Sequence, residues 1–438
     1  MERTVIESLK TWKDSPDRKP LILQGARQVG KTWLMKEFGR QCYKNTAYFQ
    51  FDNNPGLAEI FNIDYKISRI IEALEIKSGH KIKPGDTLII FDEIQECPKA
   101  LTSLKYFCEN APEYHIVAAG SLLGLSQHGG TGFPVGKTDF LKIYPLDFIE
   151  FIKATDRPQL AEAICKKDFE LLKPFEDELE RLLKTYLYVG GMPEVVRDFA
   201  KNRDYKKTRK IQKAILYAYE NDFSKHIPAN TAEKTRMLWQ SIPSQLAREN
   251  KKFLYSAIRT GARAKEYEIA LNWLSDAGLV YKISRTKKPS MPLMAYQDFE
   301  AFKLFVLDVG LLAAMTSLDA KAILEKNRIF EEFKGALSEQ YVCQQFKSSC
   351  PDMPLYYWTD STSRSEIDFI AQISNMIVPV EVKASINLKA KSLHNFIRNN
   401  NTKKAVRTSL AQFKINDGGI LYDIPLWAIG GMEEIVFQ

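Results

Sequence analysis

The stretch GARQVGKT at residues 25–32 decides the fold of the first part of this 438-residue chain. It follows the apolar run Leu21–Gln24 and precedes a helical pattern over Thr32–Arg40. Glycines let the backbone approach phosphate oxygens, and successive N–H groups then point inward as an anion-binding nest. The sequence therefore predicts a phosphate-binding loop between a strand and a helix. Its residues are Gly25, Ala26, Arg27, Gln28, Val29, Gly30, Lys31 and Thr32.

A second apolar run, Leu88–Phe91, ends in the acids Asp92 and Glu93. The first acid at such a strand end holds Mg²⁺ in nucleotide hydrolases. We therefore expect ATP and Mg²⁺ as cofactors, with Lys31 on the β- and γ-phosphates and with Thr32 and Asp92 on the metal ion. Glu93 is placed to take a proton from the attacking water, so it is the predicted base of ATP hydrolysis.

Ser121 follows a third apolar run, His115–Ala119, after a single glycine. A polar side chain at this point could sense the γ-phosphate beside the attacking water. An ordinary serine at a strand-to-loop junction is the equal alternative.

Five short apolar runs alternate with helical patterns within residues 1–150. This alternation predicts an α/β domain with a parallel sheet and crossover helices. The runs are Leu21–Gln24, Ala47–Phe51, Leu88–Phe91, Ile116–Ala119 and Leu141–Ile143.

The pattern of the remaining chain predicts three further domains. Residues 151–240 are helical and form a lid or connector, in which the basic stretch Lys201–Lys213 is expected to be a solvated helix face. Within 241–325, an amphipathic helix at Lys265–Ala277 precedes strands at Leu279–Ile283 and Leu293–Tyr296 with a basic connection. This arrangement is typical of a winged helix-turn-helix. Residues 326–438 form a small α/β domain.

Acidic residues of the last domain carry a second possible chemistry. Asp368 lies on the expected strand Glu366–Ile373, and Glu381 and Lys383 share one face of the next strand. Asp368 and Glu381 would bind Mg²⁺, and Lys383 would stabilise the developing charge during phosphodiester cleavage. Glu339 lies upstream on an expected helix. Solvent-facing charges on the strands are the alternative.

The segments 25–32, Phe91–Gln95 and Ala119–Leu123 together resemble a large family of prokaryotic AAA+ superfamily P-loop ATPases with an uncharacterised C-terminal domain. The resemblance implies a five-stranded core ordered 5-1-4-3-2, a helical lid and a winged helix. Relatives often have arginine where this chain has Lys137, so no arginine finger is assigned. Further similar segments are FPVGK (133–137), YPL (144–146), GGMPE (190–194) and DVGLL (308–312).

The C-terminal acids also resemble a known superfamily, the PD-(D/E)xK nucleases with their restriction-endonuclease-like fold. Glu339, Asp368, Glu381 and Lys383 match its motif positions one by one. Folds of this kind also persist as binding modules, so the resemblance leaves cleavage open.

Composition limits the partners and the compartment. The formal net charge is +8, which fits an anionic partner such as DNA without requiring one. No run of about 18 apolar residues and no signal-peptide pattern is present, so we expect a cytoplasmic protein without a membrane partner. The six cysteines are scattered, which argues against structural zinc. The sequence leaves a homo-oligomer possible.

Three functions are compatible with these features. The chain could be an ATP-driven protein that acts on DNA through a winged helix and a nuclease-like domain. It could instead be a nucleotide-dependent switch that binds DNA or a protein partner without cutting. In the third, the winged helix only packs, and the ATPase acts on protein partners.

Overall fold

The computed structural model describes residues 2–121, 134, 136–248, 251–321, 328–360, 365–385 and 390–437. These residues divide into two compact units. The N-terminal unit comprises Glu2–Tyr144 with Asp276–Gly278, and the C-terminal unit comprises Pro145–Ser275 with Leu279–Gln438.

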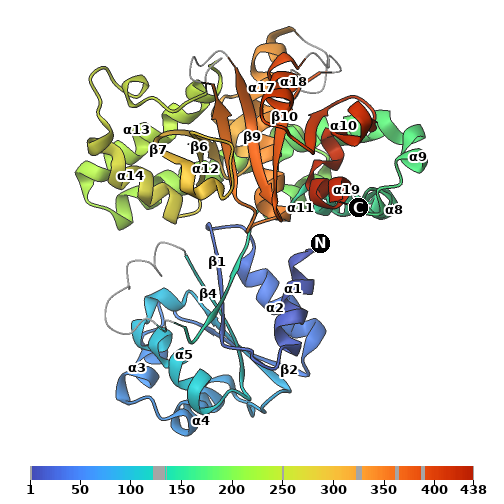
Figure 1. Cartoon of the computed structure of the whole chain (residues 1–438). Helices are drawn as coiled ribbons and strands as arrows, with labels where there is room; N and C mark the ends of the chain where they lie inside the picture. Colours follow the sequence, from blue (N-terminus) through green and yellow to red (C-terminus); the bar gives the residue numbers. More distant parts are fainter. Residues whose placement is uncertain are drawn as a thin grey trace. The chain divides into compact units, whose positions relative to one another are not determined.

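The N-terminal unit contains a five-stranded sheet in the order β2-β3-β4-β1-β5. Three of its strands, β1, β2 and β4, are labelled in Figure 1. All neighbouring strands are parallel, so the order 5-1-4-3-2 and the parallel pairing are confirmed. The buried strand β3 is apolar along its whole length until Asp92, as expected for a central parallel strand. The strands are β1 (Leu21–Gly25), β2 (Asn45–Gln50), β3 (Thr87–Asp92), β4 (His115–Ser121) and β5 (Asp139–Lys142).

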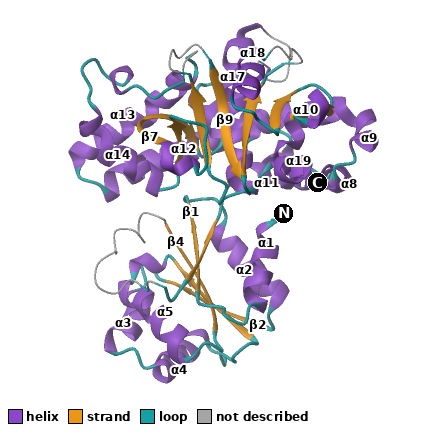
Figure 2. Cartoon of the chain, in the orientation of Figure 1, coloured by secondary structure: helices purple, strands orange, loops and turns teal. Residues whose placement is uncertain are grey.

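Helices cover both faces of this sheet, as crossover connections between parallel strands require. Helices α1 (Val5–Asp14) and α2 (Lys31–Cys42) lie on one face, and three others lie on the opposite face (Figure 2). A core of buried aliphatic and aromatic side chains, among them Phe49, Phe61 and Phe91, fills the space beneath those three helices. They are α3 (Pro55–Ile63), α4 (Ile67–Ser78) and α5 (Pro98–Asn110).

The C-terminal unit begins with a helical region, as the sequence predicts for residues 151–240. Its lysines at 206, 207, 210 and 213 are exposed, which confirms the expected solvated face, whereas Arg209 packs over the Tyr188 ring at 4.2 Å. The helices are α7 (Phe148–Ala154), α8 (Pro158–Lys166), α9 (Phe169–Leu172), α10 (Glu176–Val189), α11 (Pro193–Asn202), α12 (Tyr205–His226) and α13 (Ala229–Leu246).

An eight-stranded mixed sheet follows, in the order β12-β13-β11-β10-β9-β8-β6-β7. Helices that pack against it include α17 (Arg328–Ser349), which contacts β7 and β10, and α18 (Lys391–Asn399), which contacts β9 and β10. Its strands are β6 (Val280–Thr286), β7 (Gln297–Val306), β8 (Leu355–Thr359), β9 (Glu366–Ile373), β10 (Met376–Val382), β11 (Ala405–Ser409), β12 (Lys414–Asn416) and β13 (Leu421–Pro425).

The prediction of one strand of the winged helix is wrong. Leu293–Tyr296 forms a short 3-10 helix, and the partner of β6 is the longer strand β7 that follows it. Leu293 is fully buried in the core that also contains Phe396. It is apolar because it packs in that core, and not because it belongs to a strand. The preceding amphipathic helix is present as α14 (Ala264–Asp276).

The β6–β7 hairpin is part of the large sheet, because β6 pairs in parallel with β8 at Arg285–Tyr357 and Thr286–Trp358. Strands from both sides of the predicted boundary at residue 325 therefore share one sheet. Sequence periodicity reports each strand alone and carries no information on this pairing.

Three of the motif segments noted in the sequence meet at a buried aspartate of the C-terminal unit. Asp308, fully buried, accepts hydrogen bonds from the backbone N–H groups of Gly191 at 2.6 Å and Leu311 at 2.9 Å. A Cβ atom on Gly191 would lie 2.0 Å from the carbonyl oxygen of Leu146, so only glycine fits there. Burial raises the pKa of Asp308 to about 6. These segments thus build the core of the unit.

Candidate functional site

The loop 25–32 has the geometry of an anion-binding nest. Gln28 and Gly30 have positive φ angles of 66° and 94°, which turns the backbone between β1 and α2. Gly25 permits a close approach, since a Cβ atom there would lie 2.4 Å from the carbonyl oxygen of Ile143. Gly30 lies at the N-cap of α2, where the helix dipole favours a negative charge.

Lys31 lies buried within this loop. Its Nζ donates to the carbonyl oxygens of Gly25 and Ala26, both at 2.9 Å. Burial lowers the pKa of Lys31 to about 8, although the charges of Glu93 and Asp92 oppose this shift. The ammonium group therefore donates to backbone carbonyl oxygens, and phosphate oxygens can replace these as acceptors.

Thr32 and Asp92 meet at the end of β3. The Thr32 hydroxyl donates to Asp92 Oδ2 at 2.7 Å, and the Tyr48 hydroxyl from β2 donates to the same oxygen at 2.8 Å. A hydroxyl and a carboxylate side by side next to a phosphate nest are the ligand types that Mg²⁺ prefers with a nucleotide. These residues fit the expected metal ion. Tyr48 was missed by the sequence analysis, since only strand pairing places β2 beside β3.

Glu93 directly follows Asp92 in the left-handed region, at φ 52°. Its carboxylate accepts a hydrogen bond of 2.6 Å from the side chain of Gln95. The predicted base is thus held at the carboxyl end of β3 by a partner that the sequence analysis did not identify. The side chain of Ser121, together with Leu122, Leu123, Phe133 and Val135 of the motif segments, lies outside the described residues.

A buried arginine near the start of the chain braces the loop. The Arg3 guanidinium donates to the carbonyl oxygens of Val29 at 3.2 Å and Tyr144 at 2.8 Å. Its exposed fraction is 8%. Arg3 therefore ties the phosphate-binding loop to the end of the N-terminal unit. No local pattern in the sequence could indicate this contact, which spans 26 and 141 residues along the chain.

In the C-terminal unit, the structure brings the nuclease-like residues together. Asp368 on β9 accepts a 2.8 Å hydrogen bond from the backbone N–H of Val382 on β10. The Lys383 ammonium lies 2.6 Å from Glu381 Oε1. Glu339 on α17 contributes to the charge environment of both Asp368 and Glu381.

Two lysines that the sequence analysis did not single out enter this acidic cluster. The Lys303 ammonium, fully buried, lies 2.5 Å from Glu366, 3.4 Å from Glu339 and 4.0 Å from Asp368. Lys251 forms a second ion pair with Glu339. A lone lysine within the apolar stretch Ala301–Leu307 was a signal for such a buried charge.

The acids of this cluster differ in the direction of their pKa shifts, and the two lysines are one cause of the difference. Burial alone would raise the pKa of Glu339, but Lys251 and Lys303 lower it to about 2. Burial, with the charges of Glu339 and Glu381, raises the pKa of Asp368 well above its usual range. The pKa of Glu381 is raised by burial as well, against the attraction of Lys383.

A metal ion at Asp368 and Glu381 stays a prediction. Among the residues that the structure describes, no three His, Cys, Asp or Glu side chains are arranged to hold a metal ion. The Lys303 ammonium already lies among Glu339, Glu366 and Asp368. We therefore derive no step through a metal ion at this cluster.

Comparisons with known protein families match three parts of the chain, the first of which contains the phosphate-binding loop. Residues 17–152 match a family model described as an AAA domain. The N-terminal unit has an AAA-type P-loop ATPase fold. Residues 180–322 and 334–428 match two further families, described as domains of unknown function, DUF8612 and DUF4143. A search of curated proteins found no match.

Solved structures of archaeal proteins are similar over most of their length. The Walker-type ATPase PABY2304 of Pyrococcus abyssi is 14% identical, with a TM-score of 0.45, covering 71% of this chain and 95% of that one. The Orc1 protein of Aeropyrum pernix, solved in complex with DNA, is 11% identical with a TM-score of 0.29, covering 72% and 90%. Cdc6p from Pyrobaculum aerophilum is 11% identical with a TM-score of 0.24, covering 72% and 92%.

Lys137 of the AAA domain has an ion-pair partner within its own unit. Lys137, where relatives often have arginine, forms an ion pair of 3.0 Å with Glu109 of the same unit.

No described helix of the chain is long and apolar enough to cross a membrane.

The brace between Arg3 and the loop of the AAA domain leads to a testable prediction. We expect Arg3→Ala to weaken ATP binding about tenfold, because the loop carbonyl at Val29 loses a charge-assisted hydrogen bond of about 1.5–3 kcal/mol. Titration with a fluorescent ATP analogue measures this. Arg18→Ala is the matched control, since Arg18 also donates to two carbonyl oxygens, of Lys13 and Pro112. Equal losses in both variants would contradict a specific role of Arg3.

Proposed function

We propose that this chain is an ATPase whose nucleotide cycle controls the binding of nucleic acid, first of all DNA, by its C-terminal unit. The observation that carries the ATPase part is the 2.7 Å hydrogen bond from Thr32 to Asp92. It places the two side chains expected on Mg²⁺ next to each other, directly after the nest of residues 25–30 and beside Lys31.

The residues act in a simple order. Loop amides hold the phosphate oxygens, and Lys31 exchanges its bonds to Gly25 and Ala26 for bonds to the phosphates. Thr32 and Asp92 would hold Mg²⁺, and this ion would supply neutralisation of charge on the phosphates. Glu93 exchanges its hydrogen bond from Gln95 for one from the attacking water and accepts the proton of that water.

Replacing Glu93 by glutamine tests the base. We expect Glu93→Gln to bind ATP as tightly as the wild type but to hydrolyse it about 10²–10⁴-fold more slowly, because the amide accepts no proton at neutral pH. Phosphate release under saturating ATP measures turnover. Glu96→Gln, an exposed acid three residues further on, is the matched control. Normal turnover in Glu93→Gln would show that another group is the base.

The nucleic-acid part rests on charge and on the arrangement of one hairpin. The chain has a net charge of +8. Helix α14 is followed by the antiparallel strands β6 and β7, and the connection between them carries the exposed lysines Lys287 and Lys288. A helix followed by a hairpin with a cationic connection is the arrangement of a winged helix. Basic side chains there can neutralise backbone phosphates.

Binding of a fluorescent DNA duplex by the full chain tests this proposal. We expect affinity to fall steeply with salt and to differ between ATP and ADP, and we expect Lys31→Ala to lose that difference. Absence of DNA binding at low salt in every nucleotide state would falsify the nucleic-acid part. The ATPase part would stand independently on the Glu93 measurement.

Cleavage is a second candidate, favoured by one atom. Glu381 Oε2 is buried and has no hydrogen-bond partner, beside Lys383 and close to Asp368. If the cluster cuts DNA with Mg²⁺, Asp368→Asn removes the activity and Asp352→Asn, at an exposed position, keeps it. If the wild type with ATP and Mg²⁺ leaves DNA and RNA intact, this candidate is wrong.

A further inference from the structure

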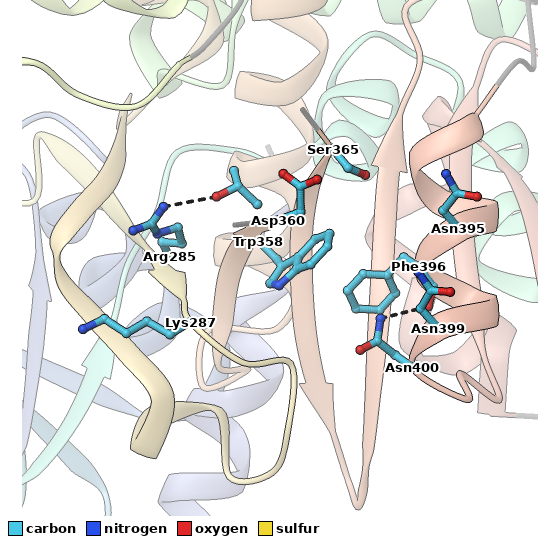
Figure 3. A pocket seen from close by; sticks show the side chains of 10 residues that line it. Arg285, Lys287, Trp358, Asp360, Ser365, Asn395, Phe396, Asn399 and Asn400 are labelled. Atoms are coloured by element: carbon cyan, nitrogen blue, oxygen red, sulfur yellow. Dashed lines mark hydrogen bonds between the residues drawn. The ribbon is translucent and has the colours of Figure 1, made fainter. Parts of the chain in front are cut away.

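A cavity of about 560 Å³ opens in the C-terminal unit between the ends of β6 and β8 and the helix α18 (Figure 3). Pockets for small ligands commonly enclose about 300–1,000 Å³, so the volume suits a ligand the size of a nucleotide. The cavity is separate from the ATP site, which lies wholly in the N-terminal unit. Neither the ATPase reaction nor the acidic cluster uses its lining residues.

Two cations lie on the β6 side of this cavity. Arg285 donates to Asp298 through Nε at 3.0 Å and Nη2 at 2.6 Å, and through Nη1 to Thr359 at 3.2 Å. These bonds use three of the five guanidinium N–H groups and hold the group in place, so two remain for a ligand. Lys287 is exposed two residues further along. A fixed guanidinium beside a solvated ammonium suits a phosphate group.

An aromatic and three carboxamides lie across from these cations (Figure 3). Trp358 is half-buried and packs edge-to-face on the buried Phe396, with ring centroids 5.0 Å apart. Asn395 and Asn399 of α18, and Asn400 just after it, are all exposed. An indole supported from behind is a stacking surface for a nucleobase, and carboxamides match the donors and acceptors of base edges.

The cavity adjoins the acidic cluster along the sheet. Thr359, which lines the cavity, is paired with Glu366 of β9, and Glu366 is the acid that lies 2.5 Å from Lys303. A ligand in the cavity would therefore lie near Glu366, whose partner Lys303 also contacts Glu339 and Asp368.

We propose that this cavity binds one nucleotide of a single-stranded nucleic acid, with the base against Trp358 and a phosphate at Arg285 and Lys287. This inference rests on the proposed nucleic-acid function and names the form of the ligand. A nucleotide would contact both sides of the cavity at once, its phosphate on one side and its base on the other. An inorganic anion or a sugar would not use both sides.

Fluorescence anisotropy of a labelled single-stranded oligonucleotide with the full chain, without ATP, tests the proposal. We expect Lys287→Glu to weaken binding at least about tenfold and to reduce the magnitude of the salt slope by at least about 0.7, since it removes one phosphate contact on a single strand and adds a negative charge. Lys282→Glu is the matched control, since Lys282 is exposed on β6, the strand that Lys287 follows, but does not line the cavity. It should bind nearly as the wild type.

A second variant probes the stacking side. Trp358→Ala should weaken binding about tenfold, whereas Trp358→Phe should keep most of it, because any aromatic face stacks on a base. Unlabelled deoxynucleoside monophosphate should compete much less well than the strand. Equal competition would overturn the assignment to a strand in favour of a free nucleotide.

The outcomes separate this inference from the proposed function. If the wild type binds the oligonucleotide and both cavity variants bind it equally well, the cavity is not the site and the inference is wrong. If the wild type binds neither single-stranded nor duplex DNA, the proposed nucleic-acid function itself fails.

Discussion

Replacing Lys31 by alanine should reduce ATP turnover by about 10²–10³-fold, the effect of removing one preorganised group that stabilises charge in a transition state. The buried ammonium lies inside the loop, on the carbonyl oxygens of Gly25 and Ala26, where the phosphates are expected. Without it, the charge that develops on the transferred phosphate loses the buried ammonium that the loop holds in place. Phosphate release and ATP titration together separate a loss of turnover from a loss of binding.

The control for this variant is Lys44→Ala. Lys44 is exposed, forms an ion pair of 3.0 Å with Asp86, and precedes β2 at the end of the sheet opposite the loop. It should keep wild-type turnover. If Lys31→Ala stays folded and also keeps wild-type turnover, the loop is not the hydrolytic site.

Replacing Lys303 by methionine should destabilise the C-terminal unit by about 3–5 kcal/mol. The side chain is fully buried, and its ammonium is within ion-pair distance of Glu339, Glu366 and Asp368. Methionine keeps much of the volume but leaves buried carboxylates without a partner. Denaturant unfolding of the full chain, followed by a probe in this unit, measures the loss.

The sign of the pH dependence follows from the same contacts. In the wild type, Lys303 helps to lower the pKa of Glu339 to about 2, so this acid contributes stability that is present above its unfolded pKa and lost as pH falls toward 2. In Lys303→Met that contribution shrinks, so the difference from the wild type should narrow as the solution becomes more acidic. Lys282→Met, at an exposed lysine of β6, should cost less than about 1 kcal/mol at every pH. Equal destabilisation by both variants would contradict the role of the buried charge.

The N-terminal site was largely predictable because its chemistry is local. The loop 25–32 and the pair Asp92–Glu93 each lie within a few residues, and parallel strands bring their carboxyl ends to one edge of the sheet. Tyr48 and Arg3 were not predictable, since their contacts with Asp92 and Val29 depend on which strands and helices become neighbours.

The C-terminal unit shows the same division more sharply. The spacing of Glu381 and Lys383 predicts a shared face, and the structure places them 2.6 Å apart. The strand expected at Leu293–Tyr296 was wrong because a short apolar run does not tell a strand from a buried turn of helix. Lys251 and Lys303 reach the acids from segments distant in sequence, and they decide the charge of the cluster.

By itself, the sequence determined the phosphate-binding loop and the strand that ends in Asp92, because both are short-range patterns. The order of the strands around them was expected only from the family resemblance. Only the tertiary structure decided that the β6–β7 hairpin joins the C-terminal sheet and that a buried lysine balances the acidic cluster. It also decided that Trp358, Arg285 and α18 enclose a cavity. Each of these depends on strand pairing and packing between distant segments, which periodicity along the chain does not encode.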